Sequence, residues 1–305
     1  MNLDELKHKT NGTQQNQSLT STRIGDLENA ISVMGTQMTS PDAKMDRLLG
    51  LLSSKKELDE VGTAKSMCCK FDCSMPTLLL SLETSSPVCS VALHRVADGS
   101  LVGQSELRLD KSHSTHLTVL TEQLLENTGH RLADLAAVAV SDGPGSYTGL
   151  RIGAAAAKGL CFALDIPLVA VSTLRALAAQ VAAGTARPES WLYCPMLDAR
   201  RQEVYAALYT YEGQEVLAPT PLILDTHTLA EQRAEHSVLF FGNGAAKFRA
   251  VLDEVAPAGF LAGIEPSAVA VGALAVAAYQ RQEFQDVAYY EPFYLKEVYT
   301  TTPRA

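Results

Sequence analysis

A pattern that occurs twice in this chain, about 115 residues apart, constrains its fold more than any other feature of the sequence. In each copy an apolar segment ends in an acidic residue, Glu83 in the first and Asp198 in the second. Ten residues after each acid comes a leucine, and a glycine follows soon after: Leu93 and Gly99 in the first copy, Leu208 and Gly213 in the second. Such segments are typical of β-hairpins, so the repetition predicts two lobes that each open with a hairpin.

The first copy contains the alternating elements of a complete α/β lobe. Strands are predicted at 78–82, 88–93, 101–109, 136–141 and 168–171, and helices at 115–127, 148–164 and 174–183. Two hairpin lobes that face each other across a cleft form the architecture of the actin, sugar-kinase and Hsp70 ATPase superfamily (ASKHA, with ribonuclease H-like lobes). The sequence therefore predicts an α/β, two-lobed actin-like ATPase fold, with a first lobe at 75–186 and a second at 187–305.

Residues 1–74 differ in composition from the rest of the chain. Polar residues cluster near the start, and apolar residues then recur at three- and four-residue spacing until Pro41, which should break a helix. The segment is predicted to be an appended extension, partly amphipathic helix or disordered. Two interpretations stay open: a short coiled-coil or docking helix at 22–39 with a second helix at 42–60, or an extension without activity upstream of Met75.

The charge balance and the hydropathy exclude several classes of protein. With 25 Lys and Arg against 34 Asp and Glu, the formal net charge is −9. This balance disfavours nucleic-acid binding through a broad basic face and leaves only a local basic patch open. The longest apolar run, 268–279, is shorter than the ~20 residues of a membrane span. We expect a cytoplasmic protein without an apolar leader or membrane contact.

Metal-binding and catalytic patterns are weak. The six cysteines form no C-x-x-C pair, and no histidines accompany them at zinc spacing. His113 and His116 are three residues apart at a predicted helix start, but no glutamate lies between them and no third ligand is near. Two solvated histidines are the favoured interpretation, so no metal site is expected. The spacing singles out no hydrolase nucleophile with its base, so no catalytic residue is expected either.

Residues at the hairpin turns are candidates for a nucleotide cleft. A carboxylate with small hydroxyl residues can hold Mg²⁺ through water, while turn amides bind phosphate. The second turn fits this chemistry poorly, because Arg200 and Arg201 follow its acid where glycine would be expected. An acid that only caps its own turn is the alternative. The candidates for this vestigial cleft are Glu83, Thr84, Ser85, Asp198, Gly242, Asn243 and Gly244, of which the last three either admit an adenine ring or simply turn the chain.

A glycine-rich segment follows the strand predicted at 136–141. Its notable residues are Gly143, Gly145, Ser146, Thr148, Gly149 and Arg151. The segment is not a P-loop, because no Gly-Lys-Ser/Thr follows, and it is not the dinucleotide motif G-x-G-x-x-G. Two interpretations stay open: the start of the next helix binds an anion, or the small residues let this helix pack closely against a neighbour.

Several segments resemble the TsaB (YeaZ) family, a subunit of the bacterial machinery that makes threonylcarbamoyladenosine in tRNA. The resemblance covers about 76–298. Its motifs are Leu-Glu-Thr-Ser at 82–85, Gly-Pro-Gly-Ser-Tyr-Thr-Gly-Leu-Arg-Ile-Gly at 143–153, Ile-Pro-Leu-Val-Ala-Val-Ser-Thr-Leu at 166–174, Asp-Ala-Arg-Arg-Gln-Glu-Val-Tyr at 198–205 and Glu-Pro-Phe-Tyr-Leu at 291–295. It implies a role in adding threonylcarbamoyl to the N6 of the adenosine next to the anticodon in tRNAs that read ANN codons.

The resemblance also implies that the chain is a non-catalytic subunit that activates its paralogue, TsaD. Where TsaD has a His-x-x-x-His metal pair, this chain has Thr173 and Leu177, and neither can replace an imidazole ligand. The implied partners are TsaD, the ATPase TsaE and, through the complex, tRNA, with a homodimer when the chain is alone. The subunit itself would require no cofactor, whereas ATP and Mg²⁺ would serve the complex.

The implied interface with TsaD consists of two first-lobe helices, one strongly apolar and one with a face of small residues. The candidates are Leu117, Leu120, Leu124, Ile152, Ala155, Ala156 and Gly159. The alternative for the leucines is that they pack into the chain's own sheet. The alternative for the whole chain is an independent ATP-dependent kinase or hydrolase of the actin-like superfamily, which would use the two hairpin acids.

Overall fold

The computed structural model describes residues 77–109, 113–252 and 258–296, all within the unit Pro76–Ala305. The predicted extension at 1–74 lies outside the described residues. Among the helices that are described, none is long and apolar enough to cross a membrane.

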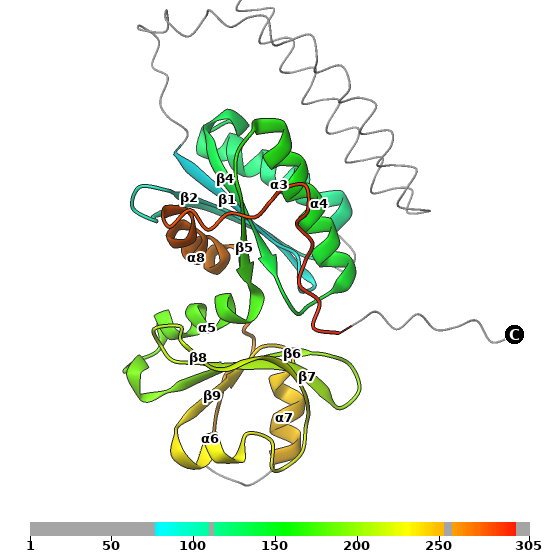
Figure 1. The fold of residues 1–305 in the computed structure, drawn as a ribbon, viewed down its shortest axis with the longest axis vertical. Helices are drawn as coiled ribbons and strands as arrows, with labels where there is room; N and C mark the ends of the chain where they lie inside the picture. The colour runs from blue at the N-terminus through cyan, green and yellow to red at the C-terminus, as the bar shows by residue number, and fades with distance from the viewer. Residues whose placement is uncertain (1–76, 110–112, 253–257, 297–305) are drawn as a thin grey trace, which may run out of the picture. The chain divides into compact units, whose positions relative to one another are not determined.

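The first sheet contains the predicted hairpin that ends in Glu83 (Figure 1). Its strands are β1 (Leu78–Glu83), β2 (Val88–Arg95), β3 (Leu101–Arg108), β4 (Leu135–Asp142) and β5 (Leu168–Ser172), in the order β3-β2-β1-β4-β5. Strand β1 pairs antiparallel with β2 and parallel with β4. Because helices cover both faces of the sheet, β1 is buried along its whole length and is apolar except at Ser81 and Glu83, whereas the edge strand β3 is partly exposed.

The second sheet repeats the first. Its strands are β6 (Leu192–Asp198), β7 (Glu203–Tyr209), β8 (Glu215–Ile223), β9 (Val238–Phe241) and β10 (Ala258–Phe260), in the order β10-β9-β6-β7-β8. Strand β6 pairs antiparallel with β7 and parallel with β9, as β1 does with β2 and β4. The repeated topology confirms the predicted duplication and the two-lobed, actin-like α/β fold.

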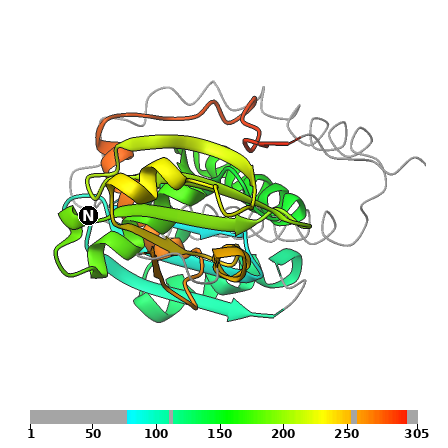
Figure 2. The same ribbon diagram turned by 90° about the horizontal axis from the view of Figure 1, so that it is seen from below.

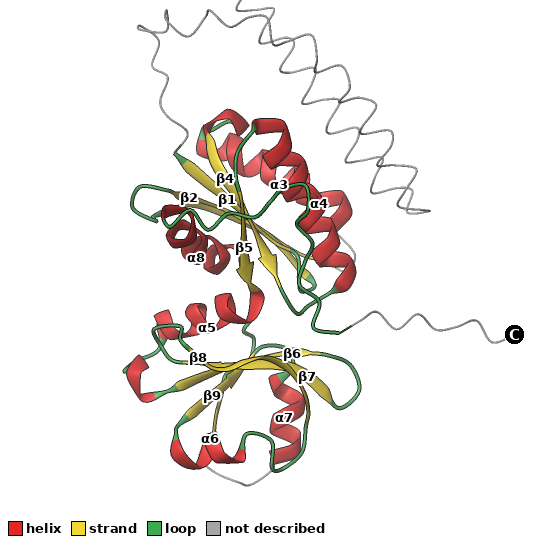
Figure 3. Ribbon diagram, viewed as in Figure 1, coloured by secondary structure: helices red, strands yellow, loops and turns green. Residues whose placement is uncertain are grey.

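Helices lie on both faces of each sheet (Figures 1 and 3). The first sheet has α3 (His113–Thr128) and α4 (Tyr147–Leu164) on one face and α8 (Ala268–Gln280) on the other. The second has α6 (Ala230–Glu235) and α7 (Ala245–Leu252) on one face, the face seen from below in Figure 2, and α5 (Thr173–Gly184) on the other. Short 3₁₀ turns occur at Leu132–Asp134 and Pro188–Ser190.

The last helix of each half packs on the sheet of the other half. Helix α5 follows β5 of the first sheet, yet its Leu174 and Leu177 share a core with Tyr193 and Phe241 of the second sheet. Helix α8 follows β10 of the second sheet, yet it packs on β1 and β2 of the first. The segment 268–280 therefore completes the first lobe, although the sequence placed all of 187–305 in the second.

The contact between α8 and the first sheet is close because of one glycine. A Cβ built at Gly272 would lie well inside van der Waals contact of His94 Nδ1 and 2.6 Å from Ser81 Oγ, and both of these side chains are buried. A Cβ built at Gly159, in the interior of α4, meets no atom within 4 Å. The two glycines lie in similar helical backbone but differ in the space beside them.

This difference predicts opposite effects of the same substitution. Gly159→Ala should raise the free energy of unfolding by roughly 0.5–1 kcal/mol, because alanine has the higher helix propensity. Gly272→Ala should lower it by about 1–3 kcal/mol, because the new methyl group overpacks the α8 contact. Urea unfolding of both variants checks the prediction, and a stabilised Gly272→Ala variant would contradict the close packing of α8.

Candidate functional site

The glycine-rich segment lies directly on the turn of the first hairpin. The backbone N–H of Ser146 donates to the carbonyl of Ser85 at 2.6 Å, and the Thr84 hydroxyl donates to the carbonyl of Gly149 at 2.8 Å. Thr84 and Ser85 are both buried. The Ser85 amide is engaged as well, because it donates to Glu83 Oε1 at 2.5 Å, so the chain's own groups occupy the turn.

Close approach explains the glycines of this segment. A Cβ at Gly149 or Gly153 would lie well inside van der Waals contact of a Thr84 oxygen, and a Cβ at Gly145 would lie 2.6 Å from the Ser85 carbonyl oxygen. Gly143 turns the chain at a φ of +115°, a conformation that L side chains rarely adopt. Of the two interpretations of the segment, the structure supports close packing.

The remaining residues of the segment belong to the start of α4. Ser146 caps the helix, and its hydroxyl accepts from the N–H of Gly149 at 3.2 Å. Thr148 is exposed. Arg151 is also exposed, and its guanidinium donates to the hydroxyl of Tyr147 at 2.8 Å and lies 5.5 Å from the centre of the same ring.

Glu83 is fully buried at the end of β1. Its Oε1 accepts from the N–H of Ser85 at 2.5 Å, whereas its Oε2, like the hydroxyls of Ser85 and Ser141, has no hydrogen-bond partner among the described residues. Ser90, directly opposite Glu83 in the hairpin, accepts from the N–H of Ala268 at the start of α8. Burial raises the pKa of Glu83 above its ordinary value, against the hydrogen bond from the Ser85 N–H that lowers it. This acid is enclosed by α8 and the sheet.

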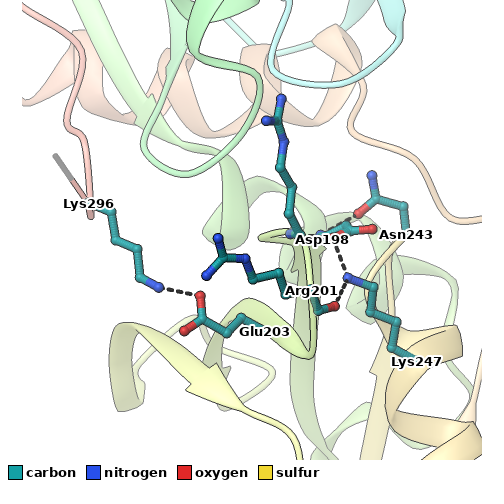
Figure 4. A network of polar contacts seen from close by, with 7 residues as sticks. Asp198, Arg201, Glu203, Asn243, Lys247 and Lys296 are labelled. Atoms are coloured by element: carbon teal, nitrogen blue, oxygen red, sulfur yellow. Dashed lines mark hydrogen bonds and ion pairs between the residues drawn. The ribbon is translucent and has the colours of Figure 1, made fainter. Parts of the chain in front are cut away.

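Asp198, at the end of β6, is held by the chain's own donors (Figure 4). Its carboxylate accepts from Lys247 Nζ at 2.5 Å and from the N–H of Arg200 at 2.6 Å. Burial acts to raise the pKa of this carboxyl, but the bonds from Lys247 and Arg200 lower it below its ordinary value. Lys247 also donates to the carbonyl of Arg201 at 2.7 Å, so an ammonium group lies at the turn where a nucleotide's metal would be expected.

The segment Gly242–Gly244 packs on β6. The N–H of Gly244 donates to the carbonyl of Met196 at 2.9 Å, and Asn243 Oδ1 accepts from the N–H of Asp198 at 2.8 Å. A Cβ at Gly242 would lie well inside van der Waals contact of the same Met196 carbonyl, and the φ of Gly242 is +93°. The glycines of this segment bring its backbone against β6, so they have a packing role of their own.

The positions considered for metal binding are engaged in packing or local bonds. Thr173 is buried and its hydroxyl donates to the carbonyl of Asp142, while Leu177 lies in the second core. His113 is buried, so the expectation of two solvated histidines is wrong for this residue, and His116 Nδ1 lies 2.7 Å from the neighbouring Thr115 hydroxyl. No group of three or more His, Cys, Asp or Glu side chains is arranged for a metal ion in the part of the chain that the structure describes.

The candidates on α3 and α4 divide between core and surface. Leu117, Leu120, Leu124 and Ala156 are buried in the first core, and Ile152 packs against it. Ala155 is exposed and Gly159 is half-buried. The outer faces of the two helices instead present Val119, Tyr147 and Phe162, which are 41%, 38% and 49% exposed. The sequence did not predict that these three side chains lie on the surface. They are recognised only because the structure shows which neighbouring residues on each helix are buried.

A C-terminal strap at 285–296 was also not predicted. Asp142 Oδ1, at the end of β4, accepts from the N–H of Phe293 at 2.7 Å and lies 3.3 Å from the hydroxyl of Tyr290. Lys158 of α4 donates to the carbonyls of Ala288 and Tyr290. The strap ends at Lys296, which pairs with Glu203 of β7. It runs along α4 and reaches the second hairpin.

Comparison with known proteins gives one consistent family. The family model described as "TsaD: tRNA N6-adenosine threonylcarbamoyltransferase" matches residues 108–301. The tRNA threonylcarbamoyladenosine biosynthesis protein TsaB of Bacillus subtilis is 32% identical over 180 residues, which cover 58% of this chain and 76% of that protein. TsaB of Escherichia coli is 35% identical over 133 residues, 43% of this chain and 54% of that protein.

Solved structures give the same result. A Pseudomonas aeruginosa protein described as similar to peptidase YEAZ has a TM-score of 0.63 and 30% identity, and the match covers 72% of this chain and 100% of that one. A second structure, YeaZ from Pseudomonas aeruginosa, has a TM-score of 0.59 and 28% identity over the same shares.

The enclosed carboxyl of Glu83 predicts a pH-dependent effect of Glu83→Gln. Because the folded state holds this proton more tightly than the unfolded state does, the stability of the unmodified chain falls as the pH rises through and above the ordinary glutamate pKa. Glutamine has no proton to lose. The variant should therefore be more stable than the unmodified chain at neutral pH, and the difference should shrink as the pH falls below the ordinary glutamate pKa.

Urea unfolding across this pH range measures the effect. The matched control is Glu122→Gln on the exposed side of α3, where the change should stay within about 0.5 kcal/mol. A Glu83→Gln variant that is less stable at neutral pH would show that the ionised carboxylate supports the fold.

Proposed function

The chain belongs to the TsaB (YeaZ) family, and on that premise we propose that it is a non-catalytic subunit of the complex that makes threonylcarbamoyladenosine in tRNA. In this role it activates TsaD, the catalytic subunit, which adds threonylcarbamoyl to the N6 of the adenosine next to the anticodon. The alternative of an independent kinase or hydrolase is not favoured by the relatives, which carry TsaB names.

The observation that carries the non-catalytic role is the state of the two hairpin acids. Glu83 is enclosed beneath α8, and Asp198 is paired with Lys247. A nucleotide with its metal would have to displace an ammonium group at one turn and the segment that covers the other turn. Each displacement breaks hydrogen bonds within the chain, so the two turns are poor ligand sites as they stand.

We place the surface that binds TsaD on the outer faces of α3 and α4. These helices lie side by side on one face of the first sheet (Figure 3). Their exposed apolar residues include Val119 and Phe162. Ala155 and Gly159 lie on α4 between Tyr147 and Phe162, and their small size lets a partner helix approach the backbone. Exposed apolar side chains around a small centre fit a helix of a protein partner.

The other parts of the proposal follow from the same role. TsaE joins the complex, tRNA is bound by the assembly, and the same helices form a homodimer when TsaD is absent. The subunit needs no cofactor of its own, whereas ATP and Mg²⁺ serve the complex. A protein that works on tRNA acts in the cytoplasm.

Reconstitution tests the proposed function. TsaD, TsaE and the donor-forming enzyme should modify tRNA only when this chain is added, with the modified nucleoside measured by mass spectrometry. The chain alone should show no sustained ATP turnover. Turnover by the chain alone that Glu83→Ala abolishes would instead support the kinase or hydrolase.

The docking surface predicts that Ala155→Glu weakens binding of TsaD by about tenfold or more, because the partner helix would bury a charge. Ala156, one residue further, is a core position and its substitution would test stability instead. The matched control is Ala250→Glu, at an exposed position of α7. Both variants should unfold at similar urea concentrations.

Co-purification and calorimetric titration with TsaD measure the effect. Equal affinity of the Ala155→Glu and Ala250→Glu variants would show that α4 is not part of the interface.

A further inference from the structure

A tilted aromatic pair joins the start of α4 to the strap. The rings of Tyr147 and Tyr294 are 5.0 Å apart at 43°, and the guanidinium of Arg151 lies over the Tyr147 ring. Next to Tyr294 in the strap, Phe293 is 53% exposed. Aromatic rings and a guanidinium plane that solvent can reach are the groups on which unpaired bases stack.

The strap connects this pair to the turn of the second hairpin. Lys296, two residues after Tyr294, pairs with Glu203, and Arg201 lies at the same turn (Figure 4). Arg200 and Arg201 are exposed and adopt left-handed conformations, with φ of +67° and +51°. A continuous strip thus runs from the start of α4 through the strap to the turn. We call these residues, Tyr147, Arg151, Phe293, Tyr294, Lys296, Arg200 and Arg201, the strap strip.

The charge of the strip is opposite to that of the chain. It has four cationic residues and no acidic one, in a chain whose net charge is −9. Of the nearby acids, Glu203 pairs with Lys296 and Asp198 with Lys247, whereas Glu291 of the strap is exposed. Neither Arg200 nor Arg201 has an ion-pair partner within 4.0 Å among the described residues through its guanidinium. These residues are the candidate for the local basic patch that the composition left open.

We propose that the strap strip binds a single-stranded loop of RNA, with bases stacked on the aromatic side chains and phosphates against the arginines and Lys296. This inference rests on the proposed function, which makes an RNA the substrate of the complex. Aromatic side chains interleaved with cations fit the alternating bases and phosphates of an unpaired strand. A protein partner would not require a series of cationic side chains. Binding of a protein instead of RNA is the alternative that the test distinguishes.

The test uses the reconstituted complex of this chain with TsaD and a fluorescently labelled anticodon stem-loop RNA. Tyr147→Leu should weaken RNA binding about 5- to 100-fold, because the ring that stacks is lost while an apolar side chain of similar size remains. Arg201→Asn should weaken binding and reduce the salt dependence of log K by about 0.7 per lost phosphate contact. Asparagine tolerates the left-handed backbone, so the turn is kept.

The controls match these variants in residue type, exposure and backbone. Arg187→Asn replaces another exposed arginine with a left-handed φ, +51°, which precedes β6 whereas Arg201 follows it. Tyr211→Leu replaces a tyrosine that is 45% exposed at the turn between β7 and β8. Neither control should change RNA affinity or the salt slope.

Four further outcomes are decisive. Photo-crosslinks from a 4-thiouridine-labelled stem-loop to Tyr147 or Tyr294 would support direct contact. Unchanged RNA affinity in Tyr147→Leu and Arg201→Asn would overturn the inference. Variants that lose TsaD while the assembled fraction binds RNA normally would show a protein-docking surface and overturn it too. If the complex assembles and binds RNA through the strip, but tRNA is modified equally well without this chain, the proposed function is wrong and the inference about the strip still holds.

Discussion

The contact between the backbone of α4 and the turn of the first hairpin determines much of what this chain can do. Gly149 and Gly153 let the helix lie against Thr84, at a distance that no other residue type would permit. The contact has two effects at once. It occupies the space in which the turn could bind a ligand, and it fixes the opposite side of α4 as an exposed surface. A closed cleft and an available helix face are two results of the same packing.

The second hairpin reaches a similar state by electrostatics. Lys247, from α7, neutralises Asp198 and binds a carbonyl of the same turn. The two halves thus have the same topology but differ in how their turns are occupied, the first by backbone and the second by a charged side chain.

The order of strands and helices could be predicted from the sequence because each half has clear alternation and turn residues. The partner sheet of α8 could not be predicted. The helix is apolar on all sides, with a sequence of mostly Ala and Val, so no stripe indicates which sheet it faces. Helix α4 contains a run of four alanines at 154–157, and identical residues give no sign of which side is buried. The sequence therefore does not show that Ala155 is exposed and Ala156 is buried. The Asp198–Lys247 pair joins residues 49 apart in sequence, beyond any local pattern.

The exchange of α5 and α8 between the sheets has a consequence for the origin of the fold. Each half, taken alone, would leave one sheet face bare and one apolar helix unsupported. Two copies of a half-length ancestor would cover both sheet faces and support both helices by exchanging their terminal helices, as in a domain-swapped dimer with a two-fold axis. When the two copies are joined in one polypeptide, the exchange of helices becomes intramolecular and permanent. In this chain the halves differ in what they expose, the first an apolar helix surface and the second a charged turn.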